Sequence, residues 1–164
     1  MIGLTSSEPV NSPTRSRKLT LSEYVRRRNG VPFGAKGALG NMMQRSLGAR
    51  SFAGFWRYWN PIFGYGLGRY VFVPLKSVTP PALALVVTFV VCGALHDLVT
   101  MLVRGSAAFL FTPWFFFLGV GVLLGGAVGM DLSGRPWFVR AAVHLAYLSI
   151  CLLLAVMVNS YAGL

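Results

Sequence analysis

Three long apolar segments follow residue 80, and they limit the structures that this chain can form. They cover residues 82–103, 109–130 and 138–161 and are separated by short connections containing Gly, Ser, Asp and Arg. The first segment would measure about 33 Å as an α-helix, which is enough to cross the hydrocarbon core of a bilayer. The pattern predicts an all-α integral membrane protein with three transmembrane helices.

The distribution of charge supports this prediction and orients the chain. Charged residues make up 12% of the sequence and hydrophobic residues 55%, whereas a soluble domain has roughly 25% charged residues. Of the 15 Lys and Arg, only Arg104, Arg135 and Arg140 follow residue 80. By the positive-inside rule, we expect a cytoplasmic N-terminus and an outside C-terminus. We expect the membrane to be a bacterial inner membrane, which the charge distribution does not itself identify. Because the basic half is joined to apolar spans, membrane lipids are expected partners and nucleic acid is not.

The chain divides into three regions by composition. Residues 1–18 are rich in Ser, Thr, Pro and Arg and are predicted to be a flexible basic tail. Residues 19–80 are predicted to hold a basic helix over 19–28, an amphipathic helix from residue 39, and an interfacial or re-entrant helix over 62–76. Residues 81–164 are the three-helix transmembrane region.

An aromatic and basic stretch, 51–60, precedes the apolar segments. Phe52, Phe55, Trp56 and Trp59 recur at helical spacing and share one face, while Arg57 and Tyr58 lie on another. Ser51 is a suitable N-cap, and Pro61 predicts that the helix ends near Asn60. Taken alone, the stretch is more typical of the aromatic belt at a membrane surface than of a functional site.

A polar stripe runs along the first apolar segment. Thr88, Cys92, His96 and Thr100 recur at every fourth position and therefore face one side of a helix. Ionisable residues inside a membrane are costly and usually serve a function, and a neutral His can act as a general base. The alternative for His96 is a hydrogen bond between helices. A metal site is not expected, because Cys92 and His96 form one pair and lack a third ligand.

Asp97 and three glycines are further candidates for roles within the membrane. Asp97 points about 100° away from His96, so an ion pair with Arg57, Arg69 or Arg104 is the more plausible role for it. The glycines fall at every fourth position of the second apolar segment, a pattern that lets another helix approach closely. They are Gly121, Gly125 and Gly129.

Two of these motifs together resemble the membrane-bound O-acyltransferases. Residues 51–60, SFAGFWRYWN, resemble the Phe-Trp-Arg-x-Trp motif of that family, and residues 70–75 resemble the stretch that follows it in bacterial members. Residues 91–96, VCGALH, resemble the Ser-Gly-Leu-Trp-His segment that carries the catalytic histidine of the family. The match covers roughly residues 40–100 and preserves the order of the motifs. This sequence has Leu95 where the family commonly has Trp, and Asp97 where it commonly has Gly.

The resemblance implies transfer of an acyl group from a thioester, such as an acyl-CoA co-substrate, to a hydroxyl acceptor. His96 would be the general base, Asn60 would position or polarise the reacting groups, and Trp56, Arg57 and Trp59 would shape the mouth of a tunnel. No other cofactor is implied. Members of the family are considerably longer, so other membrane chains or further copies of this chain would complete the tunnel. The alternatives are a non-catalytic subunit of a membrane complex and a lipid-surface anchor.

Overall fold

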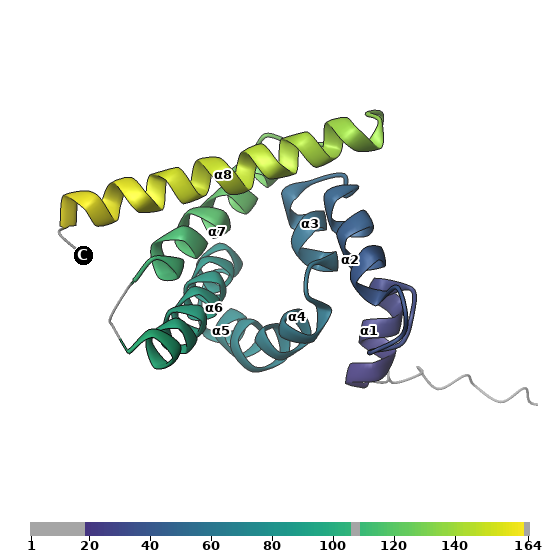
Figure 1. Cartoon of the computed structure of the whole chain (residues 1–164), viewed down its shortest axis with the longest axis horizontal. Helices are drawn as coiled ribbons and strands as arrows, with labels where there is room; N and C mark the ends of the chain where they lie inside the picture. The colour runs from purple at the N-terminus through teal and green to yellow at the C-terminus, as the bar shows by residue number, and fades with distance from the viewer. Residues whose placement is uncertain (1–18, 106–108, 163–164) are drawn as a thin grey trace, which may run out of the picture.

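The computed structural model describes residues 19–105 and 109–162, and within these ranges every regular element is helical. Figure 1 shows a long C-terminal helix lying across the bundle that the other helices form. The elements in chain order are α1 (Leu21–Asn29), α2 (Ala38–Leu47), α3 (Phe52–Tyr58), α4 (Pro61–Leu67), the π-helical turn η1 (Gly68–Phe72), α5 (Val73–Val78), α6 (Pro81–Arg104), α7 (Phe111–Ala127) and α8 (Trp137–Ala162).

The basic helix predicted over 19–28 is confirmed as α1. Thr20 and Glu23 form a reciprocal capping box, in which each side chain accepts a hydrogen bond from the backbone N–H of the other residue. Gly30 ends the helix in the left-handed conformation, with φ of 83°. The predicted tail, residues 1–18, lies outside the described residues.

The amphipathic helix expected from residue 39 is α2, and the aromatic stretch forms α3. As predicted, the Ser51 side chain caps α3 by accepting a hydrogen bond from the Gly54 N–H. Within α3, Phe55 is almost fully buried, whereas Arg57 is exposed. The aromatic face of this helix therefore turns towards the other helices, with Phe55 at its most buried point.

Residues 61–78 form one continuous helical segment that includes a π-helical turn. The Val73 N–H donates to the Gly68 carbonyl, five residues earlier, and Pro74 follows directly. Proline has no N–H and its ring displaces the carbonyl of the preceding turn, so a widened turn accommodates it without breaking the helix. A helix in this region was predicted, but its placement as interfacial or re-entrant is not confirmed.

Two of the three predicted spans are long and apolar enough to cross a membrane. They are α6, with 24 residues, and the 25 residues Trp137–Tyr161 of α8. The predicted span over 109–130 is not confirmed, because α7 has 17 residues and measures about 26 Å, less than a typical hydrocarbon core. Its start is set by Asp97, as described below, and its end by a glycine-rich turn in which Gly129 has φ of 64°.

Helix α8 contacts both the short N-terminal helices and the apolar helix α7 (Figure 1). At its start, Trp137 donates a hydrogen bond to the Gln44 carbonyl of α2, and near its end Asn159 donates to the Phe109 carbonyl before α7. The buried core lies where α6, α7 and α8 meet, and Phe52 and Trp56 of α3 pack against it. The short N-terminal helices are thus fixed against the long apolar helices.

Candidate functional site

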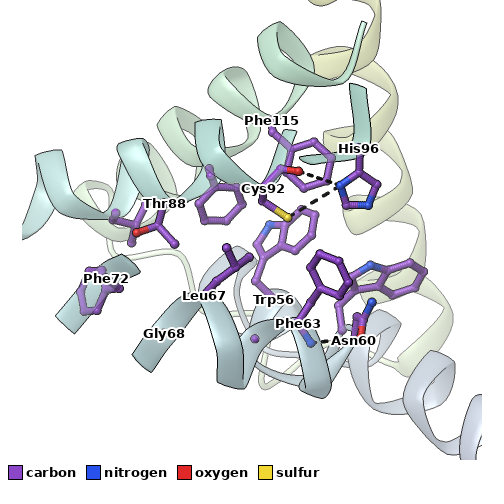
Figure 2. Close-up of a pocket in the computed structure, with 14 residues that line it drawn as sticks. Trp56, Asn60, Phe63, Leu67, Gly68, Phe72, Thr88, Cys92, His96 and Phe115 are labelled. Atoms are coloured by element: carbon purple, nitrogen blue, oxygen red, sulfur yellow. Dashed lines mark hydrogen bonds between the residues drawn. The ribbon is translucent and has the colours of Figure 1, made fainter. Parts of the chain in front are cut away.

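A cavity of about 290 Å³ lies where α3, the 61–78 segment, α6 and α7 meet (Figure 2). Its walls are mainly aromatic and aliphatic, and the polar side chains among them are few. The lining residues are Trp56, Trp59, Asn60, Phe63, Gly64, Leu67, Gly68, Phe72, Leu85, Thr88, Phe89, Cys92, His96 and Phe115. Both of the predicted catalytic residues, His96 and Asn60, therefore reach the same cavity, although 36 positions separate them in the sequence.

The hydrogen bonding of His96 determines which ring nitrogen carries a proton. Its Nδ1 lies 2.7 Å from the carbonyl oxygen of Cys92, one turn earlier on α6. A carbonyl only accepts hydrogen bonds, so Nδ1 must be the protonated nitrogen. In the neutral ring, Nε2 then carries a lone pair, and it has no hydrogen-bond partner among the described residues. This is the tautomer that a general base needs.

Aromatic rings hold the His96 imidazole in place. The ring of Phe115 stacks on it with centroids 5.1 Å apart, and the rings of Phe111 and Phe63 lie at 5.5 and 5.7 Å. Figure 2 shows His96 and Phe63 at one end of the cavity, with Phe72 and Thr88 at the other. These rings surround the imidazole with apolar surface, which strengthens electrostatic interactions beside it.

Asn60 occupies a strained position at the junction of α3 and α4. It is the one described non-glycine residue with positive φ, at 39°, a region that Asn tolerates better than most residues. Its Oδ1 accepts a hydrogen bond from the Phe63 N–H and so caps α4, whose first residue is Pro61. No acceptor among the described residues takes a hydrogen bond from the side-chain NH2 group. That donor remains available to a molecule in the cavity.

Trp56 and Trp59 form walls of the cavity, as the prediction required, but Arg57 does not line it. The Trp56 indole is fixed because its Nε1–H donates to the Tyr147 hydroxyl at 3.1 Å, and that hydroxyl donates to the Leu118 carbonyl at 2.6 Å. Arg57 lies on another side of α3, where it lines a separate basic pocket. A role for Arg57 at the mouth of this cavity therefore finds no support in the geometry.

The polar stripe of α6 reaches the cavity over most of its length. Thr88, Cys92 and His96 line it, whereas the Thr100 hydroxyl donates to the His96 carbonyl within the helix. The Cys92 sulfur lies 4.0 Å from His96 Nδ1. Because that nitrogen already carries a proton, it cannot remove one from the thiol, and the geometry does not make Cys92 an activated nucleophile.

Asp97 does not form the ion pair that was expected of it. It is 1% exposed and its carboxylate accepts hydrogen bonds from the Phe111 N–H, the Thr112 N–H and the Thr112 hydroxyl, at 2.6–2.8 Å. The physical reason is that the first N–H groups of α7 have no partners within their own helix, and a carboxylate satisfies several of them at once. Asp97 thus fixes α7 to α6 behind His96.

The three glycines of the second apolar segment serve different purposes. A Cβ on Gly121 would lie 2.5 Å from the Tyr147 ring, and one on Gly125 would lie 3.0 Å from the Phe52 ring. Gly129 lies beyond the end of α7 and meets nothing within 4 Å. The close approach that the spacing predicted is therefore made by aromatic side chains of the same chain, at two of the three positions.

Several residues of the cavity were not identified from the sequence, including Phe63, Gly68 and Phe115. A sequence signal for part of this wall was present: the residues at every fourth position from 60 to 72 line the cavity opposite the stripe on α6. These residues are Asn60, Gly64, Gly68 and Phe72.

In the part of the chain that the structure describes, no three His, Cys, Asp or Glu side chains cluster as metal ligands would.

No protein-family model, curated protein or solved structure matches this chain.

Proposed function

We propose that the chain is an acyltransferase of the membrane-bound O-acyltransferase kind, which moves an acyl group from a thioester to a hydroxyl acceptor. The observation that carries the proposal is the state of His96, whose Nδ1–H is held by the Cys92 carbonyl while Nε2 is free beside an apolar cavity. The reaction needs a base beside the acceptor hydroxyl and an apolar site for the acyl chain, and His96 with the walls of this cavity would supply both.

In the proposed reaction, Nε2 of His96 takes the proton of the acceptor hydroxyl as the oxygen attacks the thioester carbonyl. The side-chain NH2 group of Asn60 donates a hydrogen bond to the carbonyl oxygen as it gains negative charge. The carbon–sulfur bond then breaks, and the thiolate takes the proton back from His96. The acceptor becomes an ester, the donor becomes a free thiol, and His96 returns to its starting state.

The acyl chain would lie along the cavity from His96 towards Phe72. His96 and Leu85 both line it and are about 16 Å apart along α6, at the rise of an α-helix. Gly64 and Gly68 contribute no side chains to the opposite wall, which leaves room for the chain. Trp56, held by Tyr147, and Trp59 form the adjoining aromatic wall.

The proposal places the protein in a membrane, with α7 joining α6 and α8 and with the basic N-terminal region on the cytoplasmic side. Large apolar side chains on the outer faces of α6 and α8 are exposed, among them Leu98, Leu102 and Leu153. Lipid, further chains or copies of this chain would cover these faces and complete the tunnel. The bacterial inner membrane and the acyl-CoA donor are part of the proposal.

The test is the pair of variants His96→Gln and Cys92→Ser, assayed for transfer of a radiolabelled acyl group from acyl-CoA to membrane lipids and proteins. Loss of the general base should lower the rate by about 10²- to 10⁴-fold, whereas Cys92→Ser should keep at least about half of it. Both variants must be recovered in the membrane fraction with unchanged melting temperatures. Wild-type turnover in His96→Gln would exclude the proposed role, and loss of turnover in Cys92→Ser alone would indicate a cysteine nucleophile instead.

A further inference from the structure

A second pocket, of about 420 Å³, lies on the side of α3 where Arg57 is found. Arginines from four different segments line it: Arg45 of α2, Arg50 before α3, Arg57 of α3 and Arg140 in the first turn of α8. No acidic side chain is among the lining residues, which also include Gly48, Ala49, Ser51, Gly54 and Tyr58. The Arg45 guanidinium is engaged elsewhere, since its Nη1 donates to the Arg28 carbonyl at 3.1 Å. Gathering the other three like charges at one place is unfavourable unless an anion joins them.

Backbone carbonyl groups around this basic pocket already have hydrogen-bond partners. The carbonyl oxygen of Gly48 accepts a hydrogen bond from Arg140 Nη1 at 2.7 Å, that of Ala49 lies 3.1 Å from His144 Nε2, and that of Arg50 accepts from the Leu132 N–H at 2.8 Å. With these acceptors occupied, the pocket presents mainly donors. A ligand that only accepts hydrogen bonds, such as a phosphate, suits it.

Arg140 is held in place beside the pocket by a backbone carbonyl. Its Nη1 donates to the Gly48 carbonyl at 2.7 Å, and its Nε is buried with no hydrogen-bond partner among the described residues. Because Nε is inaccessible in this conformation, the guanidinium can bind a phosphate only through its remaining N–H groups. Asp131, which does not line the pocket, interacts electrostatically with Arg50. The pKa of Asp131 lies below its usual range mainly because the Ser133 N–H and hydroxyl bind its carboxylate, with a smaller contribution from Arg50.

The position of the pocket indicates where such an anion would come from. Arg140 is in the first turn of α8, which is long and apolar enough to cross a membrane, so the pocket lies at one end of that helix. Lipid phosphates lie at this depth. The neighbouring Trp137 indole, an amphipathic side chain common at membrane surfaces, fits the same placement.

We propose that this pocket binds the phosphate group of an anionic phospholipid headgroup. Arg50 and Arg57 bind the phosphate from the exposed side, and Arg140 binds it from the buried side. The site is separate from the acyl cavity, since Arg57 and Trp56 lie on different sides of α3. The proposal does not depend on acyl transfer, because it concerns binding alone.

The experiment measures lipid binding by the purified full chain in a mild neutral detergent, by native mass spectrometry and by the melting temperature. Dioctanoyl phosphatidic acid, phosphatidylglycerol and phosphatidylcholine are added separately. The variant pair Arg50→Gln/Arg57→Gln removes two lining charges without touching the backbone contact of Arg140. The pair Arg104→Gln/Arg135→Gln removes the same charge from positions that do not line the pocket.

The expected result is preferential binding of the two anionic lipids over phosphatidylcholine, weakened by about tenfold or more in the pocket variant and by less than about threefold in the control variant. Equal weakening in both variants would show general surface attraction and overturn the proposal. Equal binding of phosphatidylcholine by the wild-type chain would also overturn it. Inorganic phosphate that raises the melting temperature as much as the lipids do, at the same concentration, would overturn the lipid assignment.

Discussion

His96 and Asp97 are adjacent in the sequence, yet they act on different sides of α6. Successive residues of a helix point about 100° apart, so His96 faces the cavity while Asp97 faces the start of α7. The Asp97 carboxylate satisfies α7 donors that would otherwise be buried without partners. Because α7 carries Phe115, which stacks on the imidazole, Asp97 also positions His96 indirectly.

Replacement of Asp97 by Asn tests this capping role. The amide keeps one acceptor oxygen but turns an NH2 group towards N–H donors, so we expect a loss of about 1–3 kcal/mol of stability. The melting temperature in detergent, followed by circular dichroism, measures the effect. Asp131→Asn is the matched control, because Asp131 also accepts hydrogen bonds from a following residue but lies in an exposed turn where water replaces them. If Asp97→Asn has the same melting temperature as the wild-type chain, the cap is not important for stability.

At the scale of elements, the cavity is formed by two facing rows of residues. One row, on α6, carries Thr88, Cys92 and His96, and the other, on the 61–78 segment, contains Gly64 and Gly68. The π-helical turn at Gly68–Phe72 keeps this second segment continuous past Pro74. The last two lining residues of this wall, Gly68 and Phe72, both belong to the π-helical turn, so the wider turn sets how they face α6.

Gly68→Leu is expected to shorten the acyl chains that the cavity accepts. Gly68 has helical dihedral angles and a Cβ there would meet nothing within 4 Å, so the backbone tolerates the larger residue. Under the proposed function, transfer of long acyl chains should fall by at least about tenfold while transfer of acetyl groups changes little. Competition between acetyl-CoA and palmitoyl-CoA measures this preference. Gly66→Leu is the control, since Gly66 is equally unobstructed but does not line the cavity, and an identical shift in both variants would contradict the assigned location of the chain.

At the scale of the whole molecule, Tyr147 of α8 connects three helices. Its hydroxyl joins Trp56 of α3 to the Leu118 carbonyl of α7, its ring stacks on Phe52 at 4.0 Å, and its edge lies against Gly121. The long helices and the short N-terminal helices therefore share one buried core. Because Gly121 has no side chain, the Tyr147 ring of α8 can pack directly against the backbone of α7.

Gly121→Ala should destabilise the whole molecule by about 1–3 kcal/mol, because its Cβ would meet a Tyr147 ring that two hydrogen bonds hold in place. Gly126→Ala, on the same helix, is the matched control. A Cβ at Gly126 meets nothing within 4 Å, so this variant should be neutral or more stable by up to about 1 kcal/mol. Thermal unfolding of both variants in detergent tests the difference, and equal melting temperatures would show that α7 and α8 do not pack as described.

Local features of the fold were predictable because neighbouring residues decide them. Thr20 with Glu23, Gly30, and Ser51 each mark a helix end through contacts within a few residues. The start of α7 was not predictable in this way. Apolarity continues over residues 109–130, but the start of the helix depends on Asp97, which is more than a dozen positions away.

The sequence by itself determined that the chain is helical, that α6 and α8 are long and apolar, and that His96 lies on a polar stripe. These follow from periodicity and composition, which act within single elements. Only the tertiary structure decided that Asn60 and His96 meet at one cavity, that Arg57 faces a different pocket, and that Tyr147 fills the glycine face. Such outcomes depend on which helix faces which, and burial and hydrogen bonding between distant segments settle that choice.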